Sequence, residues 1–133
     1  RYRTGPEKAY AAIVDKSDAV KWWIKNGVSR EEYFSILYAD PIDKLTHAFY
    51  PDYIVMFTDG TVGIYETKAG ITLTSSDTSA KSDALQKYIL TLKEKGRKVR
   101  GGIVAKTSSG LFLYTGEKFN ADPTKKGWGR LDM

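Results

Sequence analysis

Glu66 and Lys68 are two charged residues whose types and spacing could carry chemistry. They lie two residues apart in the segment Thr61 to Lys68, which has the composition of a β-strand. Because alternate side chains of a strand point to one face, both are expected on the same face as Val62 and Ile64. Charged groups at the end of a buried apolar row need partners or a metal ion. The pattern therefore predicts a functional site at the end of this strand.

A third charged residue, Asp52, is expected to join this site through the turn between two strands. If residues 58–60 (Thr-Asp-Gly) form a three-residue loop with the glycine left-handed, Phe57 pairs with Thr61. Counting back along that ladder places Asp52 opposite Glu66, whereas a two-residue loop would place it on the other face. We expect the three-residue loop, or a bulge with the same effect.

The chemistry that these three residues suggest is hydrolysis of a phosphodiester bond. Two facing carboxylates repel each other unless a cation lies between them, and their hard oxygen atoms suit Mg²⁺, with Mn²⁺ as a substitute. Such an ion lowers the pKa of a bound water and stabilises charge on a phosphate. Lys68 could position the attacking water and steady the developing negative charge. The alternative is a surface hairpin in which Glu66 and Lys68 merely pair with each other.

Helices are predicted before and after the segment that carries these residues. Residues 4–7 (Thr-Gly-Pro-Glu) are typical of a helix start, and Ser17-Asp18 indicates a second helix that runs to Gly27. A long helix is expected from residues 75–77 to Lys95, with Gly96 ending it.

Strands are predicted in five places. We expect them at Tyr33–Tyr38, Tyr53–Phe57, Thr61–Lys68, Val99–Ala105 and Leu111–Tyr114, while the tail from Asn120 onward is poorly patterned. The order of helix, helix, three strands, helix and two strands predicts an α/β fold with a mixed central sheet flanked by helices.

Composition places the chain among ordinary folded proteins with a basic surface. Its 133 residues fit a single domain, residues 1–133, and its first residue is Arg1, so we expect it to belong to a longer chain. The absence of cysteine excludes disulfides and thiolate metal sites. No apolar stretch is long enough to span a membrane, so we expect a cytoplasmic protein without a membrane partner. The net charge of +5 suits a polyanionic partner, or simply a solvated basic surface.

These motifs together resemble the PD-(D/E)xK nuclease superfamily, and most closely the C-terminal endonuclease domain of type III restriction enzymes. The resemblance is carried by residues 50–55 (Tyr-Pro-Asp-Tyr-Ile-Val), Asp59-Gly60, residues 66–70 (Glu-Thr-Lys-Ala-Gly) and the double-tryptophan segment 20–26. The order of elements agrees from Glu7 to Tyr114.

The resemblance implies a Mg²⁺-dependent nuclease that cuts double-stranded DNA and has an αβββαβ core. Asp52 and Glu66 would be metal ligands, Lys68 the catalytic lysine, and Glu7 a further metal ligand from the first helix. Alternatively, Glu7 forms a capping box with Thr4 and binds no metal. In type III enzymes the nuclease follows an ATP-driven helicase region and works with a separate methylation subunit. No GxxxxGK[ST] loop occurs here, so that motor would lie outside this chain.

The remaining candidates each have a functional and a structural interpretation. Lys81 lies at the inward end of the long helix's apolar stripe and could contact DNA, or its side chain could extend to water. Trp22 and Trp23 could stack on bases or fill a core. Asp59 is explained by the turn, and His47, expected in a loop, receives no role.

Two functions other than restriction remain open for the sequence. One is a DNA-binding module that keeps the nuclease fold without catalysis. The other is a repair or junction-resolving nuclease that uses the same chemistry on another DNA structure.

Overall fold

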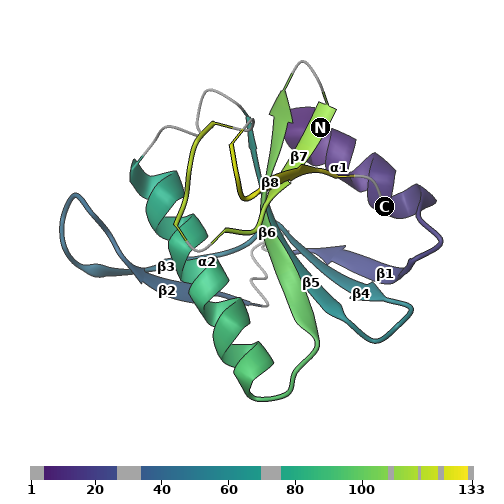
Figure 1. Ribbon diagram of the computed structural model, residues 1–133, viewed down its shortest axis with the longest axis horizontal. Coiled ribbons are helices and arrows are strands. Elements are labelled where there is room, and N and C mark those ends of the chain that lie inside the picture. The colour runs from purple at the N-terminus through teal and green to yellow at the C-terminus, as the bar shows by residue number, and fades with distance from the viewer. Residues whose placement is uncertain are drawn as a thin grey trace.

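The computed structural model belongs to the α/β class, with one six-stranded sheet, a separate two-stranded hairpin and two helices among the residues described (Figure 1). The structure describes residues 5–26, 34–69, 76–107, 110–116, 118–122 and 125–131. The helices are α1 (Gly5–Lys16) and α2 (Ser76–Glu94). The strands are β1 (Val20–Lys25), β2 (Ile36–Ala39), β3 (Thr46–Phe49), β4 (Tyr53–Phe57), β5 (Val62–Ala69), β6 (Val99–Thr107), β7 (Gly110–Tyr114) and β8 (Trp128–Arg130).

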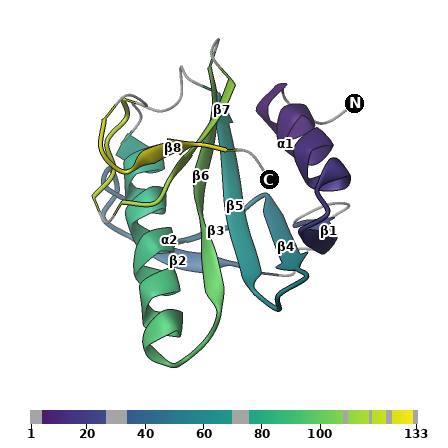
Figure 2. The same ribbon diagram turned by 45° about the vertical axis from the view of Figure 1, so that its right-hand side comes forward.

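The six-stranded sheet has the order β1-β4-β5-β6-β7-β8, and β5 and β6 are its parallel neighbours. The other neighbouring strands of this sheet run antiparallel. A parallel pair needs a long crossover, which α2 supplies between β5 and β6. Figure 2 shows α1 and α2 on opposite sides of the sheet. Its central strands are therefore covered by a helix on each face.

Aromatic side chains fill the layer between α1 and the sheet. The ring of Tyr10 on α1 packs 4.9 Å from the ring of Tyr53 and 5.3 Å from that of Tyr65, measured between centroids. Val14 lies in the same buried cluster, one helical turn further along α1. The spacing that predicted the first helix is therefore confirmed, and it marks the helix's buried side.

The opposite face of the sheet packs on α2 and on the β2–β3 hairpin. Leu85 and Ile89 of α2 are buried against Ile64 of β5, together with Ile36 of β2 and Phe49 of β3. The long helix and its end are confirmed, because Gly96 has a positive φ of 79° and the Arg97 amide bonds to the Leu92 carbonyl.

The turn between β4 and β5 has the predicted three-residue loop. The Phe57 amide donates to the Thr61 carbonyl at 2.9 Å, and Gly60 has a φ of 88°. Ile54 pairs with Ile64, and Met56 pairs with Val62. The next step of this ladder brings Asp52 level with Glu66, so the predicted register is confirmed.

The predicted second helix is wrong, because residues 20–25 form strand β1. Trp23 pairs with Val55 of β4, and its ring packs 5.4 Å from that of Tyr53. Its indole N–H donates to Asp15 at the end of α1 at 2.8 Å. The aromatic and β-branched residues of this segment favour a strand once β4 is available as a partner. Trp23 belongs to the core, while Trp22 is 45% exposed.

Three further differences concern strands. The strand predicted at 33–38 is β2, which begins at Ile36 within the described residues and pairs with the unpredicted β3 instead of joining the main sheet. Tyr33 lies outside the described residues. The poorly patterned tail contains β8, where Trp128 pairs with Tyr114.

In the part of the chain that is described, no helix is long and apolar enough to cross a membrane.

Candidate active site

Glu66 is a buried carboxylate near the end of β5, with a side chain only 8% exposed. Its Oε1 accepts a hydrogen bond from the Asp52 backbone N–H at 3.1 Å. Its Oε2 lies 3.1 Å from the Lys68 Nζ. Burial, followed by the charge of Asp52, raises the pKa of Glu66 to about 7, although Lys68 and Lys81 act in the opposite direction.

Asp52 lies just before β4, which is a neighbour of β5 in the sheet, and Thr67 orients the Asp52 carboxylate. Its Oδ2 accepts hydrogen bonds from the Thr67 backbone N–H at 3.0 Å and from the Thr67 hydroxyl at 2.6 Å. Thr67 stands between Glu66 and Lys68, so a single short stretch of β5 holds both carboxylates. Sequence reasoning missed this role, although a hydroxyl residue between the two charged ones was a visible signal.

Lys68 lies beside Glu66 on the same face of β5, as predicted, and its side chain is 20% exposed. An ammonium group that is mostly covered but still reachable can contact a substrate without a large conformational change. Asp52, Glu66 and Lys68 lie together at the open end of the β4–β5 hairpin, joined by the hydrogen bond from the Asp52 backbone N–H to Glu66 and by the Glu66–Lys68 ion pair. We call these three residues the carboxylate–lysine site.

Lys81 lies on α2, which packs on the face of β5 that carries Ile64, Glu66 and Lys68. Its Nζ lies 3.0 Å from the Asp77 Oδ2 and 5.6 Å from the centroid of the Phe49 ring. Its charge acts against the upward shift of the Glu66 pKa. The side chain is 20% exposed, so Lys81 is largely covered and does not simply extend to water.

Lys25 is a neighbour of the site that sequence reasoning did not single out. Its Nζ lies 3.9 Å from the Asp52 Oδ1 and 5.4 Å from the centroid of the Tyr53 ring. The segment was expected to be helical, which would have separated Lys25 from Asp52. In a strand over residues 20–25, Trp23 and Lys25 lie on one face, because alternate side chains point the same way. This alternation is the signal in the sequence that could have identified Lys25.

Glu7 lies in α1, but its side chain lies outside the described residues, so its metal-binding and capping interpretations both stay predictions.

His47 lies on β3 and not in a loop, and it forms a small polar cluster with two aspartates. Its Nε2 is 2.7 Å from the Asp43 Oδ2 and 3.8 Å from the Asp40 Oδ2. Within the described ranges, these three residues are the only group with at least three potential metal ligands close together. The other oxygen of each aspartate accepts backbone amides of the hairpin loop. A histidine–carboxylate contact that stabilises this loop accounts for the cluster.

Asp59 serves the turn, as predicted. Its Oδ1 accepts the Thr61 amide at 2.9 Å, and its carbonyl accepts a hydrogen bond from Lys98 at 2.9 Å.

The donor set of the carboxylate–lysine site suits a hard divalent cation. Asp52 and Glu66 supply carboxylate oxygens, and their mutual repulsion is the kind of strain that a cation relieves. Comparison of the chain with protein-family models, with curated proteins and with solved structures finds no match. The functional assignment therefore depends on the site itself.

Proposed function

We propose that this chain is a Mg²⁺-dependent DNA endonuclease domain of the PD-(D/E)xK type, and that it hydrolyses phosphodiester bonds. The observation that carries the proposal is the meeting of Asp52, Glu66 and Lys68 at one end of the β4–β5 hairpin. A chance Glu-Thr-Lys tripeptide on a surface hairpin would not bury Glu66 or give its carboxylate a hydrogen bond from the Asp52 backbone N–H.

The arrangement of elements supports the same proposal. Leaving aside the inserted β2–β3 hairpin, the chain runs α1, β1, β4, β5, α2 and β6. The first three of these strands are antiparallel neighbours, and α2 leads to β6, which lies parallel to β5. This is the αβββαβ order that the sequence resemblance implies. It puts the three site residues on the neighbouring strands β4 and β5 or directly beside them.

Each residue of the site has a role in this proposal. Asp52 and Glu66 would hold the ion, and Thr67 keeps the Asp52 carboxylate in place with two hydrogen bonds. When bound, Mg²⁺ or Mn²⁺ supplies a water of lowered pKa and neutralises charge on the phosphate. The Lys68 ammonium orients the attacking water and stabilises negative charge on the phosphate oxygens. Lys81 contacts the substrate phosphate from α2.

The resemblance extends the proposal to the cleavage module of a type III restriction enzyme. On this proposal the chain acts on double-stranded DNA, together with a helicase region of a longer parent chain and a methylation subunit.

Cleavage assays test the proposal through two variants with different expected defects. Glu66→Ala and Lys68→Ala should each slow cleavage of duplex DNA in Mg²⁺ or Mn²⁺ by roughly 100-fold or more, because the first removes a metal ligand and the second removes the ammonium group that acts on the phosphate. Only Glu66→Ala should also lose the thermal stabilisation by Mn²⁺, since Lys68 is not a metal ligand. DNA binding, measured without divalent metal, should survive in both variants.

Asp18→Ala is the control, because Asp18 is an exposed carboxylate in the turn between α1 and β1, at the end of β1 far from Asp52, and should be neutral in every assay. Cleavage that persists in the Glu66 variant contradicts the proposal. A chain that binds DNA, gains no stability from Mg²⁺ or Mn²⁺ and cuts nothing is instead a non-catalytic DNA-binding module. Preference for flaps or four-way junctions over linear duplexes indicates a repair or junction-resolving nuclease.

A further inference from the structure

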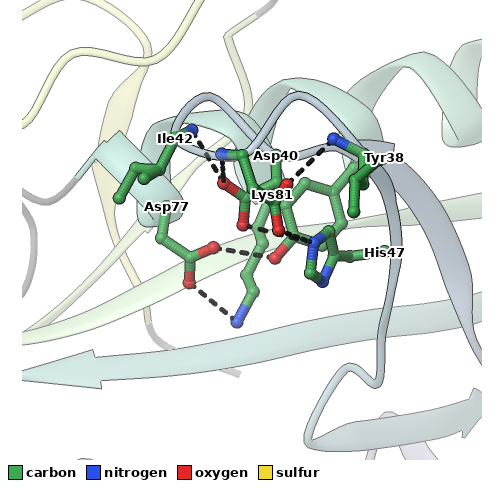
Figure 3. A network of polar contacts seen from close by, with 8 residues as sticks. Tyr38, Asp40, Ile42, His47, Asp77 and Lys81 are labelled. Atoms are coloured by element: carbon green, nitrogen blue, oxygen red, sulfur yellow. Dashed lines mark hydrogen bonds and ion pairs between the residues drawn. The ribbon is translucent and has the colours of Figure 1, made fainter.

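The β2–β3 hairpin reaches the start of α2 through a chain of polar contacts (Figure 3). The Tyr38 hydroxyl on β2 donates a hydrogen bond to the Asp77 Oδ1 at 2.8 Å. The other oxygen of Asp77, Oδ2, lies 3.0 Å from the Lys81 Nζ, four residues further along α2. A tyrosine far away in the sequence thus connects to a lysine on the helix that packs on the face of β5 carrying Glu66 and Lys68.

Both strands of the hairpin contribute to the position of Lys81. Tyr38 on β2 acts through Asp77, and the ring of Phe49 on β3 lies 5.6 Å from the Lys81 Nζ. Fixing a lysine side chain in one conformation costs considerable rotamer entropy. A lysine without contacts that fix it extends its ammonium group to water. Because Lys81 is mostly covered, these contacts determine where its charge lies.

The charges of Lys81 and Asp77 also interact with those of Glu66 and Lys68. The charge of Lys81 lowers the pKa of Glu66, and the charge of Lys68 acts on Asp77 in the same direction. The geometry agrees, because Phe49, above which the Lys81 Nζ lies, belongs to the same buried cluster as Ile64, which precedes Glu66 by two residues on β5. Tyr38 bonds to Asp77 as an uncharged hydrogen-bond donor, and burial and this bond raise its pKa still further, to about 12.

We infer that Tyr38 and Asp77 are positioning residues that hold Lys81 where it contacts a phosphate oxygen of the DNA substrate. The β2–β3 hairpin is then part of the catalytic architecture and more than a cover for the core. This inference rests on the proposed nuclease function.

A double-mutant cycle between Tyr38 and Lys81 tests the inference. Tyr38→Phe removes the hydroxyl alone and should lower kcat/KM for duplex cleavage roughly tenfold, since a hydrogen bond to a charged group is lost. In a Lys81→Ala background the same change should alter kcat/KM by less than about twofold, because the group on which Tyr38 acts is gone. A merely structural role for Tyr38 would give additive losses.

Tyr88→Phe is the matched control, because Tyr88 packs on the same face of α2 and takes no part in this chain of contacts. It should leave kcat/KM unchanged in both backgrounds.

NMR of the lysine ammonium groups gives a second readout that does not need cleavage. The held Lys81 ammonium should show a slowly exchanging signal that Tyr38→Phe weakens and Tyr88→Phe preserves. If the chain cuts no DNA but this pattern appears, the nuclease proposal fails while the positioning of Lys81 stands. If the chain cuts DNA and the cycle is additive, the positioning inference is overturned and the nuclease proposal stands.

Discussion

At the scale of single residues, the energetics of the site centre on the buried carboxylate of Glu66. It receives one backbone hydrogen bond from Asp52 and one contact from Lys68, which is little compensation for the loss of water around a charge. Burial and the charge of Asp52 therefore raise its pKa to about 7. Without a cation, the folded protein carries an acidic group that resists ionisation near neutral pH.

This shift predicts a pH dependence of stability in the absence of divalent metal. Glu66 binds its proton more tightly in the folded than in the unfolded chain, because its pKa is about 7 in the folded chain against an ordinary value of 4.5. Its contribution to stability is therefore fully present below about pH 4.5 and is lost as pH rises towards 7, by about 3 kcal/mol. Urea unfolding between pH 5 and 8, at about one-unit steps, measures it.

Glu66→Gln should remove this pH dependence, because an amide does not titrate. The variant should be about as stable as the wild type at the acidic end of the range and more stable near pH 8, roughly one unit above the pKa of Glu66. Glu94→Gln, at an exposed position, should follow the wild-type profile. Parallel profiles for wild type and Glu66→Gln would contradict the assigned shift.

At the scale of elements, the parallel pair β5–β6 depends on a close backbone approach at Gly101. This residue pairs with Ile64 and has a φ of 146°, and a Cβ atom at its position would lie 1.8 Å from the Ile64 carbonyl oxygen. The backbone itself would have to shift to admit any side chain. Since β5 carries Glu66 and Lys68, such a shift would also disturb the site.

Gly101→Ala is accordingly expected to destabilise the chain by about 3 kcal/mol or more, because it combines a backbone clash with an unfavourable φ. The unfolding free energy in urea measures the effect. Gly129→Ala in β8 is the control, since a Cβ there meets nothing within 4 Å, and it should cost less than about 1 kcal/mol. Equal losses for the two variants would show that the close approach does not matter.

At the scale of the whole molecule, the net charge of +5 favours a polyanionic partner. Four basic residues are exposed where α2 ends and β6 begins: Lys93, Lys95, Arg97 and Lys98. The carboxylate–lysine site lies near the other end of α2, so these residues would contact DNA away from the cleaved bond.

If phosphate contacts supply most of the affinity, DNA binding must be strongly dependent on salt. The affinity for a duplex is expected to fall roughly tenfold or more between about 50 and 200 mM salt, because each neutralised phosphate releases counterions. Fluorescence anisotropy without divalent metal measures it. Neutralising Lys95 and Lys98 together should flatten this dependence, and an affinity that does not respond to salt would contradict the expected mode of binding.

Local interactions explain which parts of the structure were already determined by the sequence. The Asp59 carboxylate and the left-handed Gly60 define the β4–β5 turn, and the turn sets the register that brings Asp52 to Glu66. Gly96 likewise ends α2 through bonds to the preceding turn. In each case the interacting residues are close in sequence, so residue types and spacing were sufficient.

The tertiary structure decided the rest, because those contacts join segments that are far apart in the chain. Residues 20–25 become strand β1 only because β4 offers backbone partners and Tyr53 a surface for Trp23, and this pairing alone brings Lys25 to Asp52. Similarly, β8 exists as a partner of β7. Tyr38 meets Asp77 only when the hairpin packs on α2. Local pattern cannot reveal such contacts, since the free energy that favours them comes from burial and pairing that only the folded chain provides.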